Sequence, residues 1–183
     1  NLAHLLVGSE GTLAATTGVT LKLSRLPAHR VMGVCHFPSF RAAMETTKAL
    51  VDLATLTGAI IISLAHYYAG VFSNSDALWG KLDAAGKKVN DLVWRQPLSE
   101  PGGHYDQLID STIADMKNLG TREGGSITAA QFLQRYIDEG VEWAHIDIAG
   151  AVWRPKGAPL HDKGATGFGV RLIDQLVSDN FEG

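Results

Sequence analysis

The stretch VDLATLTGAIIISLA at residues 51–65 is the most apolar part of the chain, and it decides which class of fold the sequence favours. Its apolar residues are nearly continuous, and Thr57 and Gly58 interrupt them near the middle. A continuous apolar run of this length is typical of strands that are covered on both faces. We therefore expect two buried strands over residues 51–65, or one strand with a kink at Thr57 and Gly58.

Helical and strand patterns alternate along the rest of the chain. Apolar residues three and four positions apart predict helices over residues 39–50, 77–88, 105–116, 126–137 and 170–177. Runs of β-branched or alternating residues predict strands over residues 16–23, 30–35 and 143–149. Asn74, Ser75 or Asp76 would cap the helix over 77–88, and Ser126 or Thr128 the helix over 126–137. Strands that alternate with helices predict an α/β fold with a largely parallel or mixed sheet.

The composition of the chain excludes several classes of protein. A length of 183 residues, of which 45% are hydrophobic and 19% charged, is sufficient for one domain with a buried core. The formal net charge of -3 argues against a nucleic-acid partner, which would need an excess of Lys and Arg. The longest apolar run is well short of the roughly 20 residues that span a membrane. We expect neither nucleic acid nor membrane as a partner.

The single cysteine and the start of the chain bear on the cellular location of the protein. Cys35 has no second cysteine with which to form an internal disulfide, which favours a reducing cytoplasm. The chain opens on Asn1 without a basic signal-peptide region, which indicates an excised piece. We expect a cytoplasmic location.

Two glycine-rich stretches resemble nucleotide-binding loops but do not fit them. GKLDAAGKK at residues 80–88 has five residues between its glycines where a P-loop has four, and it lies within a helical pattern. GATGFG at residues 164–169 lacks the third glycine of the dinucleotide-binding fingerprint and follows a loop. We interpret the second stretch as a turn that leads into a helix.

The histidines do not form a recognisable metal-binding motif. His145 and Asp147 alternate along one face of an expected strand, but a metal site needs three or four converging donors. We therefore favour hydrogen-bonding roles for these two side chains. His36 and His66 adjoin apolar runs and are expected in the core or at its rim.

Two further pairs of reactive side chains have simple structural explanations. Asp106 and Asp110 are one helical turn apart and could form a carboxylate pair, but an exposed helix face also explains them. Cys35 and His36 are adjacent on an expected strand, so their side chains point to opposite faces. They cannot act together as a nucleophile and its base.

The N-terminal part of the chain resembles FAD-linked oxidases of the glycolate oxidase and D-lactate dehydrogenase type. The motifs that carry the resemblance are LLVGSEGTL from residue 5, TLKLSRLP from residue 20 and HFPSFRAAM from residue 36. The resemblance implies a tight loop against the flavin of FAD, formed by Gly8, Ser9, Glu10, Gly11 and Thr12. The sequence departs from the family pattern at Ala14 and Gly18, and the family's pyrophosphate loop is absent. The alternative is a turn that joins two strands.

From Val51 onward the chain resembles leucyl aminopeptidases, the cytosolic di-metal peptidases. The motifs occur in the family's order: VDLATLTGA, GVFSN, LWGKLDAAG, WRQPL, ADMKN, GGSITAAQFL, WAHIDIAG and KGATGFGVRLI. The resemblance implies a three-layer α/β fold with helices on both faces of a mixed sheet, a peptide substrate, two divalent metals (zinc or manganese) and a hexamer. It implies that Thr55, Leu56 and Gly58 contact the peptide backbone. It also implies a pocket for the N-terminal side chain, lined by Leu119, Ala149 and Val152.

The family's metal ligands and its Asn-Thr-Asp-Ala-Glu-Gly-Arg signature would precede Val51 and do not occur in this sequence. We therefore expect no metal ligand, an incomplete aminopeptidase domain and no peptidase turnover, since two metals need several oxygen donors. The two resemblances together suggest a chimera, with an oxidase-like segment at residues 1–50 and an aminopeptidase-like segment at residues 51–183. A flavin-linked oxidoreductase fragment and a structural assembly module are the alternative functions.

Overall fold

The computed structural model describes residues 49–157 and 162–180 of the chain. The strands expected at 16–23 and 30–35, and the flavin loop expected at 8–12, lie outside the described residues. In the described part, no helix is both long enough and apolar enough to cross a membrane.

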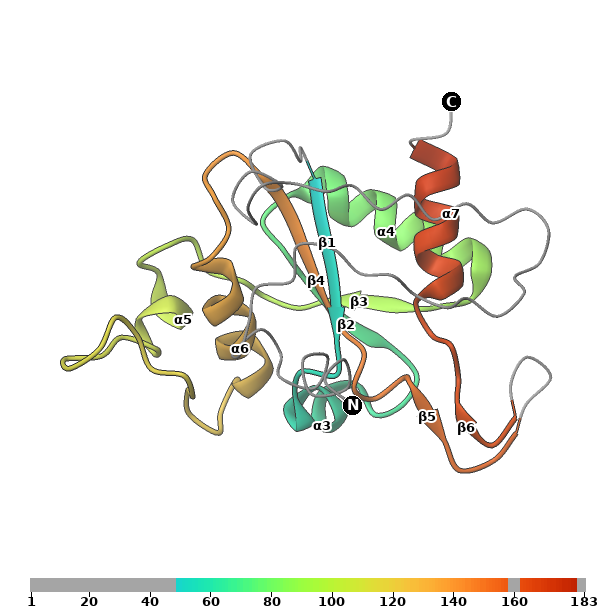
Figure 1. Cartoon of the computed structure of the whole chain (residues 1–183), viewed down its shortest axis with the longest axis horizontal. Coiled ribbons are helices and arrows are strands. Elements are labelled where there is room, and N and C mark those ends of the chain that lie inside the picture. Colours follow the sequence, from blue (N-terminus) through green and yellow to red (C-terminus); the bar gives the residue numbers. More distant parts are fainter. Residues whose placement is uncertain (1–48, 158–161, 181–183) are drawn as a thin grey trace, which may run out of the picture. The chain divides into compact units, whose positions relative to one another are not determined.

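A mixed sheet of four strands forms the centre of this region (Figure 1). The strands are β1 (Ala49–Ala54), β2 (Ala69–Ser73), β3 (Val93–Arg95) and β4 (Glu142–Asp147). They lie side by side in the order β1-β4-β2-β3. The pairs β1–β4 and β2–β3 are parallel, whereas β2 and β4 are antiparallel. The sheet is therefore mixed, as predicted.

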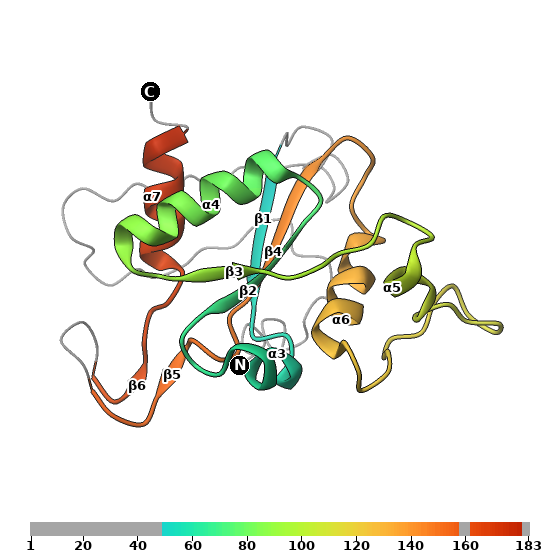
Figure 2. The same ribbon diagram turned by 180° about the vertical axis from the view of Figure 1, so that it is seen from behind.

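Helices cover both faces of this sheet. Figures 1 and 2 show α4 (Asp76–Val89) and α7 (Val170–Asn180) on one side of it. The other side carries α3 (Gly58–Leu64) and α6 (Gly125–Gln134). The remaining elements are the short helix α5 (His104–Gln107) and the antiparallel pair β5 (Trp153–Arg154) and β6 (Gly164–Ala165). This arrangement confirms a three-layer α/β fold.

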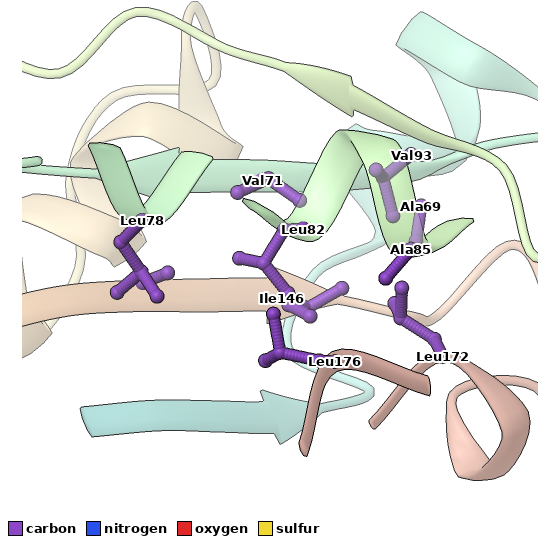
Figure 3. Packing of buried hydrophobic residues seen from close by; sticks show 10 residues of the cluster. Ala69, Val71, Leu78, Leu82, Ala85, Val93, Ile146, Leu172 and Leu176 are labelled. Carbon is purple, nitrogen blue, oxygen red and sulfur yellow. The ribbon is translucent and has the colours of Figure 1, made fainter. Parts of the chain in front are cut away.

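The alternation of side chains along β4 separates two cores. Ala144 and Ile146 are fully buried in the core that includes residues of α4 and α7. Figure 3 shows Ile146 with Leu82 of α4 and Leu172 of α7. Trp143 is fully buried in the second core, with Ile60 of α3, Phe72 of β2 and Ala130 of α6. Burial on both faces supplies the main stabilisation of such a sheet.

The apolar run that decides the fold class forms one strand and one helix, so the expectation of two strands or a kinked strand is wrong. β1 ends at Ala54, and α3 begins at Gly58. The side chain of Thr57 accepts a hydrogen bond from the backbone N–H of Ile60 at 3.1 Å and thereby caps the helix. An N-cap of this kind favours the helical start over a continued strand.

Two of the expected helices are also wrong in part. Ala49 and Leu50, the end of the helix expected over 39–50, belong to β1, and residues 39–48 lie outside the described part. The helix expected over 105–116 ends at Gln107. The hydroxyl of Ser111 accepts hydrogen bonds from the N–H groups of Ile113 and Ala114, and such local bonds compete with a continuing helix.

The other expected elements are present with shifted ends. The helices expected over 77–88 and 170–177 correspond to α4 and α7. The strand expected over 143–149 corresponds to β4. Ser75, one of the three expected caps, is the N-cap of α4. α6 covers most of the helix expected over 126–137, but Gly124, in the left-handed conformation, precedes it in place of a Ser126 or Thr128 cap. Strands β2 and β3 were not expected from the sequence.

Candidate functional site

A cavity of about 560 Å³ lies between the start of α3, the loop of residues 118–122 and one face of α6. Three of the six residues expected to bind peptide line it, namely Leu56, Gly58 and Leu119. The other three, Thr55, Ala149 and Val152, are not among its lining residues. The structure thus divides the expected residues into three that line the cavity and three that lie outside its lining.

The carboxylate of Asp147 at the end of β4 holds the end of β1 in place. One oxygen accepts hydrogen bonds from the N–H groups of Leu56 and Ala149, both at 3.2 Å, and the other accepts from the hydroxyl of Thr57 at 2.7 Å. The N–H of Ile148 also donates to the carbonyl of Ala54 at 2.9 Å. The ends of these two parallel strands therefore lie side by side, with Thr55 and Ala149 just beyond them.

Small residues at the strand ends have different roles. A side chain at Gly58 would meet no atom within 4 Å, so this glycine leaves open space in the cavity wall. A side chain at Gly150 would overlap the backbone carbonyl of Ala65, so this glycine permits the turn after β4 to pack against the end of α3. His66 reinforces that packing, because its Nδ1 donates to the carbonyl of Gly150 at 2.8 Å.

The far wall of the cavity is one face of α6. Its lining residues are spaced three and four positions apart: Gly125, Thr128, Ala129, Phe132 and Leu133. Of these residues only Thr128 was singled out from the sequence, as a possible helix cap, although this spacing is the signature of one helix face and could have identified them all. Gly120 fixes the loop of residues 118–122 against α6, because an added Cβ would lie 2.6 Å from the Cβ of Thr128.

Arg135, directly after α6, connects that helix to the segment that carries Asp106 and Asp110. Its guanidinium forms ion pairs with Asp106 at 2.7 Å and with Asp110 at 2.6 Å. Asp106 is buried and Asp110 follows the end of α5, so an exposed helix face does not explain this pair. Burial alone would raise the pKa of Asp106, but hydrogen bonds from Arg135 and from the N–H of Gly102 outweigh it and lower that pKa.

Replacing Arg135 with methionine is expected to lower the free energy of unfolding by about 2 kcal/mol at pH 7, because the buried Asp106 loses its charged partner. The pKa of Asp106 is lowered in the folded chain from 3.8. The contribution of the pair is therefore complete above this value and is lost as the pH falls through the lowered pKa. Urea unfolding should show the difference between wild type and variant shrinking in acid.

The control for this variant is Lys87→Met, which removes an exposed ion pair with Asp83. It should cost less than about 0.5 kcal/mol. An Arg135→Met variant as stable as Lys87→Met at pH 7 would contradict a stabilising role for Arg135.

The two strand residues His145 and Asp147 are both hydrogen-bonded. Nδ1 of the fully buried His145 lies 2.5 Å from a carboxylate oxygen of Asp52, whose other oxygen accepts from the indole N–H of Trp143 at 2.7 Å. Within residues 49–157 and 162–180, no group of three or more His, Cys, Asp or Glu side chains could hold a metal ion. The described residues therefore do not fit the two divalent metals that the resemblance implies.

Comparison with known proteins identifies the family of this chain. Residues 39–174 match the model of the cytosol aminopeptidase family, catalytic domain. The chain belongs to the cytosol aminopeptidase family. It is 43% identical over 171 residues to a probable cytosol aminopeptidase of Xanthobacter autotrophicus, an alignment that covers 93% of this chain and 34% of that protein. It is 53% identical over 137 residues to one of Rickettsia bellii, covering 74% of this chain and 27% of the relative.

A solved aminopeptidase structure shows the same fold. A mutant of tomato leucine aminopeptidase superposes with a TM-score of 0.69 at 38% identity, over 76% of this chain and 26% of that one. The chain thus spans about a third or less of the length of these aminopeptidases.

The aminopeptidase similarity also extends into the segment expected to resemble an oxidase. The family match begins at residue 39, and the Xanthobacter alignment, at 93% of the chain, takes in most of residues 1–50. These comparisons give no support to an oxidase-like segment or to a chimera.

Proposed function

We propose that this chain is the peptide-binding part of an aminopeptidase that removes N-terminal residues from peptides. The observation that carries the proposal is the cavity just beyond the carboxyl end of β1, which pairs in parallel with β4; the cavity is lined mainly by apolar residues. Ligands of open α/β sheets bind beyond the carboxyl ends of the strands. The cavity is large enough for an apolar amino-acid side chain.

In this proposal, the six expected residues act from two sides. Leu56, Gly58 and Leu119 receive an apolar side chain of the peptide in the cavity. Thr55, Ala149 and Val152 lie along the adjoining strand ends and contact the rest of the peptide. Asp147 positions both groups, since its hydrogen bonds fix the backbone on either side. A site fixed before binding loses less conformational entropy when the ligand arrives.

We expect the 183-residue chain to bind such a peptide without hydrolysing it. The residues that would hold the family's two divalent metals do not occur in the described part, and the signature expected before Val51 is missing from the sequence. The comparisons give no support to the alternative of a flavin oxidoreductase fragment, and the alternative of an assembly module stays a prediction.

Methyl NMR of the full chain with leucyl-leucine amide tests the proposal. Methyl signals of Leu56, Ile62 and Leu119 should shift as the peptide is added, whereas Leu82 and Leu172 of the other core should not. The absence of any shift at the cavity up to a peptide concentration of tens of millimolar would refute peptide binding there.

A glycine pair supplies a matched test of the cavity. Gly58→Leu would place a side chain in open space inside the cavity, and Gly80→Leu would do the same on the outer surface of α4. The first variant should weaken binding by about tenfold, the loss of roughly 1.4 kcal/mol, and the second should leave it unchanged. Equal affinities of the two variants would show that the peptide binds elsewhere.

We also propose a cytoplasmic location, which the names of the relatives as cytosol aminopeptidases support. The hexamer that the resemblance implies stays a prediction, and light scattering of the purified chain would test it.

A further inference from the structure

The cavity is lined by apolar and small polar residues together with a single charged side chain, that of Arg122. Arg122 is exposed, and it forms no ion pair or hydrogen bond with the side chain of any residue in the described part of the chain. Its neighbour Glu123 does not line the cavity. A cationic group thus borders a mainly apolar space without a charged partner among these residues.

The backbone on both sides of Arg122 is fixed. Gly120 lies tightly against Thr128 of α6, and Gly124, with a φ of 62°, directly precedes that helix. The hydroxyl of Thr121 donates to the carbonyl of Glu123 at 2.9 Å across the residue between them. Arg122 is therefore held at the edge of the cavity by the same helix that forms its far wall.

We propose that Arg122 makes the site selective for dipeptides over longer or blocked peptides, by binding a free C-terminal carboxylate. The inference rests on the proposed function. In a dipeptide whose second side chain enters the cavity, that second residue carries the free carboxylate on its own Cα, so the carboxylate would lie at the edge of the cavity beside Arg122. A guanidinium binds a carboxylate through two parallel hydrogen bonds, whereas a C-terminal amide or a further residue has no charge for it.

The net charge of the chain helps to distinguish a local contact with Arg122 from long-range attraction, because the two favour different peptides. At neutral pH leucyl-leucine is a zwitterion, and its amide carries one positive charge. The formal net charge of -3 favours the amide at long range. Tighter binding of the free acid therefore requires a local cationic contact.

The test compares leucyl-leucine with leucyl-leucine amide by methyl NMR titration of the full chain at low salt. The free acid should bind about fivefold tighter, as expected for one charged pair near the surface. Arg122→Gln should abolish that preference, mainly by weakening the binding of the free acid. Lys117→Gln removes the same charge from an exposed neighbour that does not line the cavity, so it should keep the preference.

A salt titration of the wild-type chain gives a second measurement that needs no variant. The preference for the acid should fall toward one at about 0.5 M salt, because screening weakens an exposed pair. Equal affinities for acid and amide, or a preference that survives in Arg122→Gln, would overturn the role of Arg122 and leave peptide binding intact. If neither peptide binds at the cavity, the role of Arg122 and the proposed function are both wrong.

Discussion

An Asp147→Ala variant should unfold with a free energy about 3 kcal/mol smaller than that of the wild type, since three hydrogen bonds to a buried carboxylate are lost together. Asp147 is fully buried, and its partners are Leu56, Thr57 and Ala149. Without it, two backbone N–H groups and a hydroxyl at the strand ends lose their acceptor. Urea unfolding gives the change in stability, and methyl NMR should show altered signals of Leu56 at the cavity.

Asp147→Asn is the matched control for the loss of Asp147. The remaining oxygen of asparagine can accept from Leu56 and Ala149, and its amide can donate to the hydroxyl of Thr57. We expect this variant to recover at least half of the lost stability. Equal losses for the alanine and asparagine variants would contradict the hydrogen-bonding role, and a loss below about 1 kcal/mol for alanine would show that Asp147 is not the connection between the strands.

A Gly150→Ala variant should also lose about 3 kcal/mol, because its methyl group would overlap a backbone atom. That atom is the carbonyl oxygen of Ala65 at the end of α3, and a backbone carbonyl cannot rotate away as a side chain can. The turn after β4 and α3 must move apart, which also breaks the hydrogen bond between His66 and Gly150. Thermal or urea unfolding measures the loss.

Gly80→Ala is the control for the substitution at Gly150. Gly80 lies inside α4, and an added Cβ there meets nothing within 4 Å. Alanine stabilises a helix interior relative to glycine by about 0.5–1 kcal/mol. A Gly150→Ala variant as stable as Gly80→Ala would show that the close approach to Ala65 can relax at little cost.

The layers of the fold could be predicted from the sequence, but the path of the apolar run could not. Three isoleucines at residues 60–62 indicate a strand by their β-branched side chains, yet they form a helix. The helix depends on Thr57, whose hydroxyl donates to Asp147, 90 residues further along, while it accepts from Ile60. From the sequence, Thr57 was interpreted as an interruption or kink in a strand, because its distant partner Asp147 is not visible there.

The motifs lead to only part of the candidate cavity, because Thr55, Ala149 and Val152 come from the aminopeptidase resemblance and do not line it. Leu56, Gly58 and Leu119 came from the same resemblance, and all three line the cavity. The pairing of Arg135 with Asp106 and Asp110 was not predicted, because the expected helix over 105–116 would have left both acids on an exposed face. Only the fold shows that a residue 29 positions beyond Asp106 lies against it.

Because β1 pairs with β4, β1 cannot complete its pairing during synthesis until β4 has also been made. Asp52 and His145 face each other across these strands, although 93 residues separate them. A ribosome that adds about 5–20 residues per second needs about 5–20 s to reach β4 after it has made β1. During that interval the most apolar stretch of the chain has emerged without the strand that covers its edge, so the nascent protein passes through a period in which chaperones and other unfolded chains compete with β4 for β1.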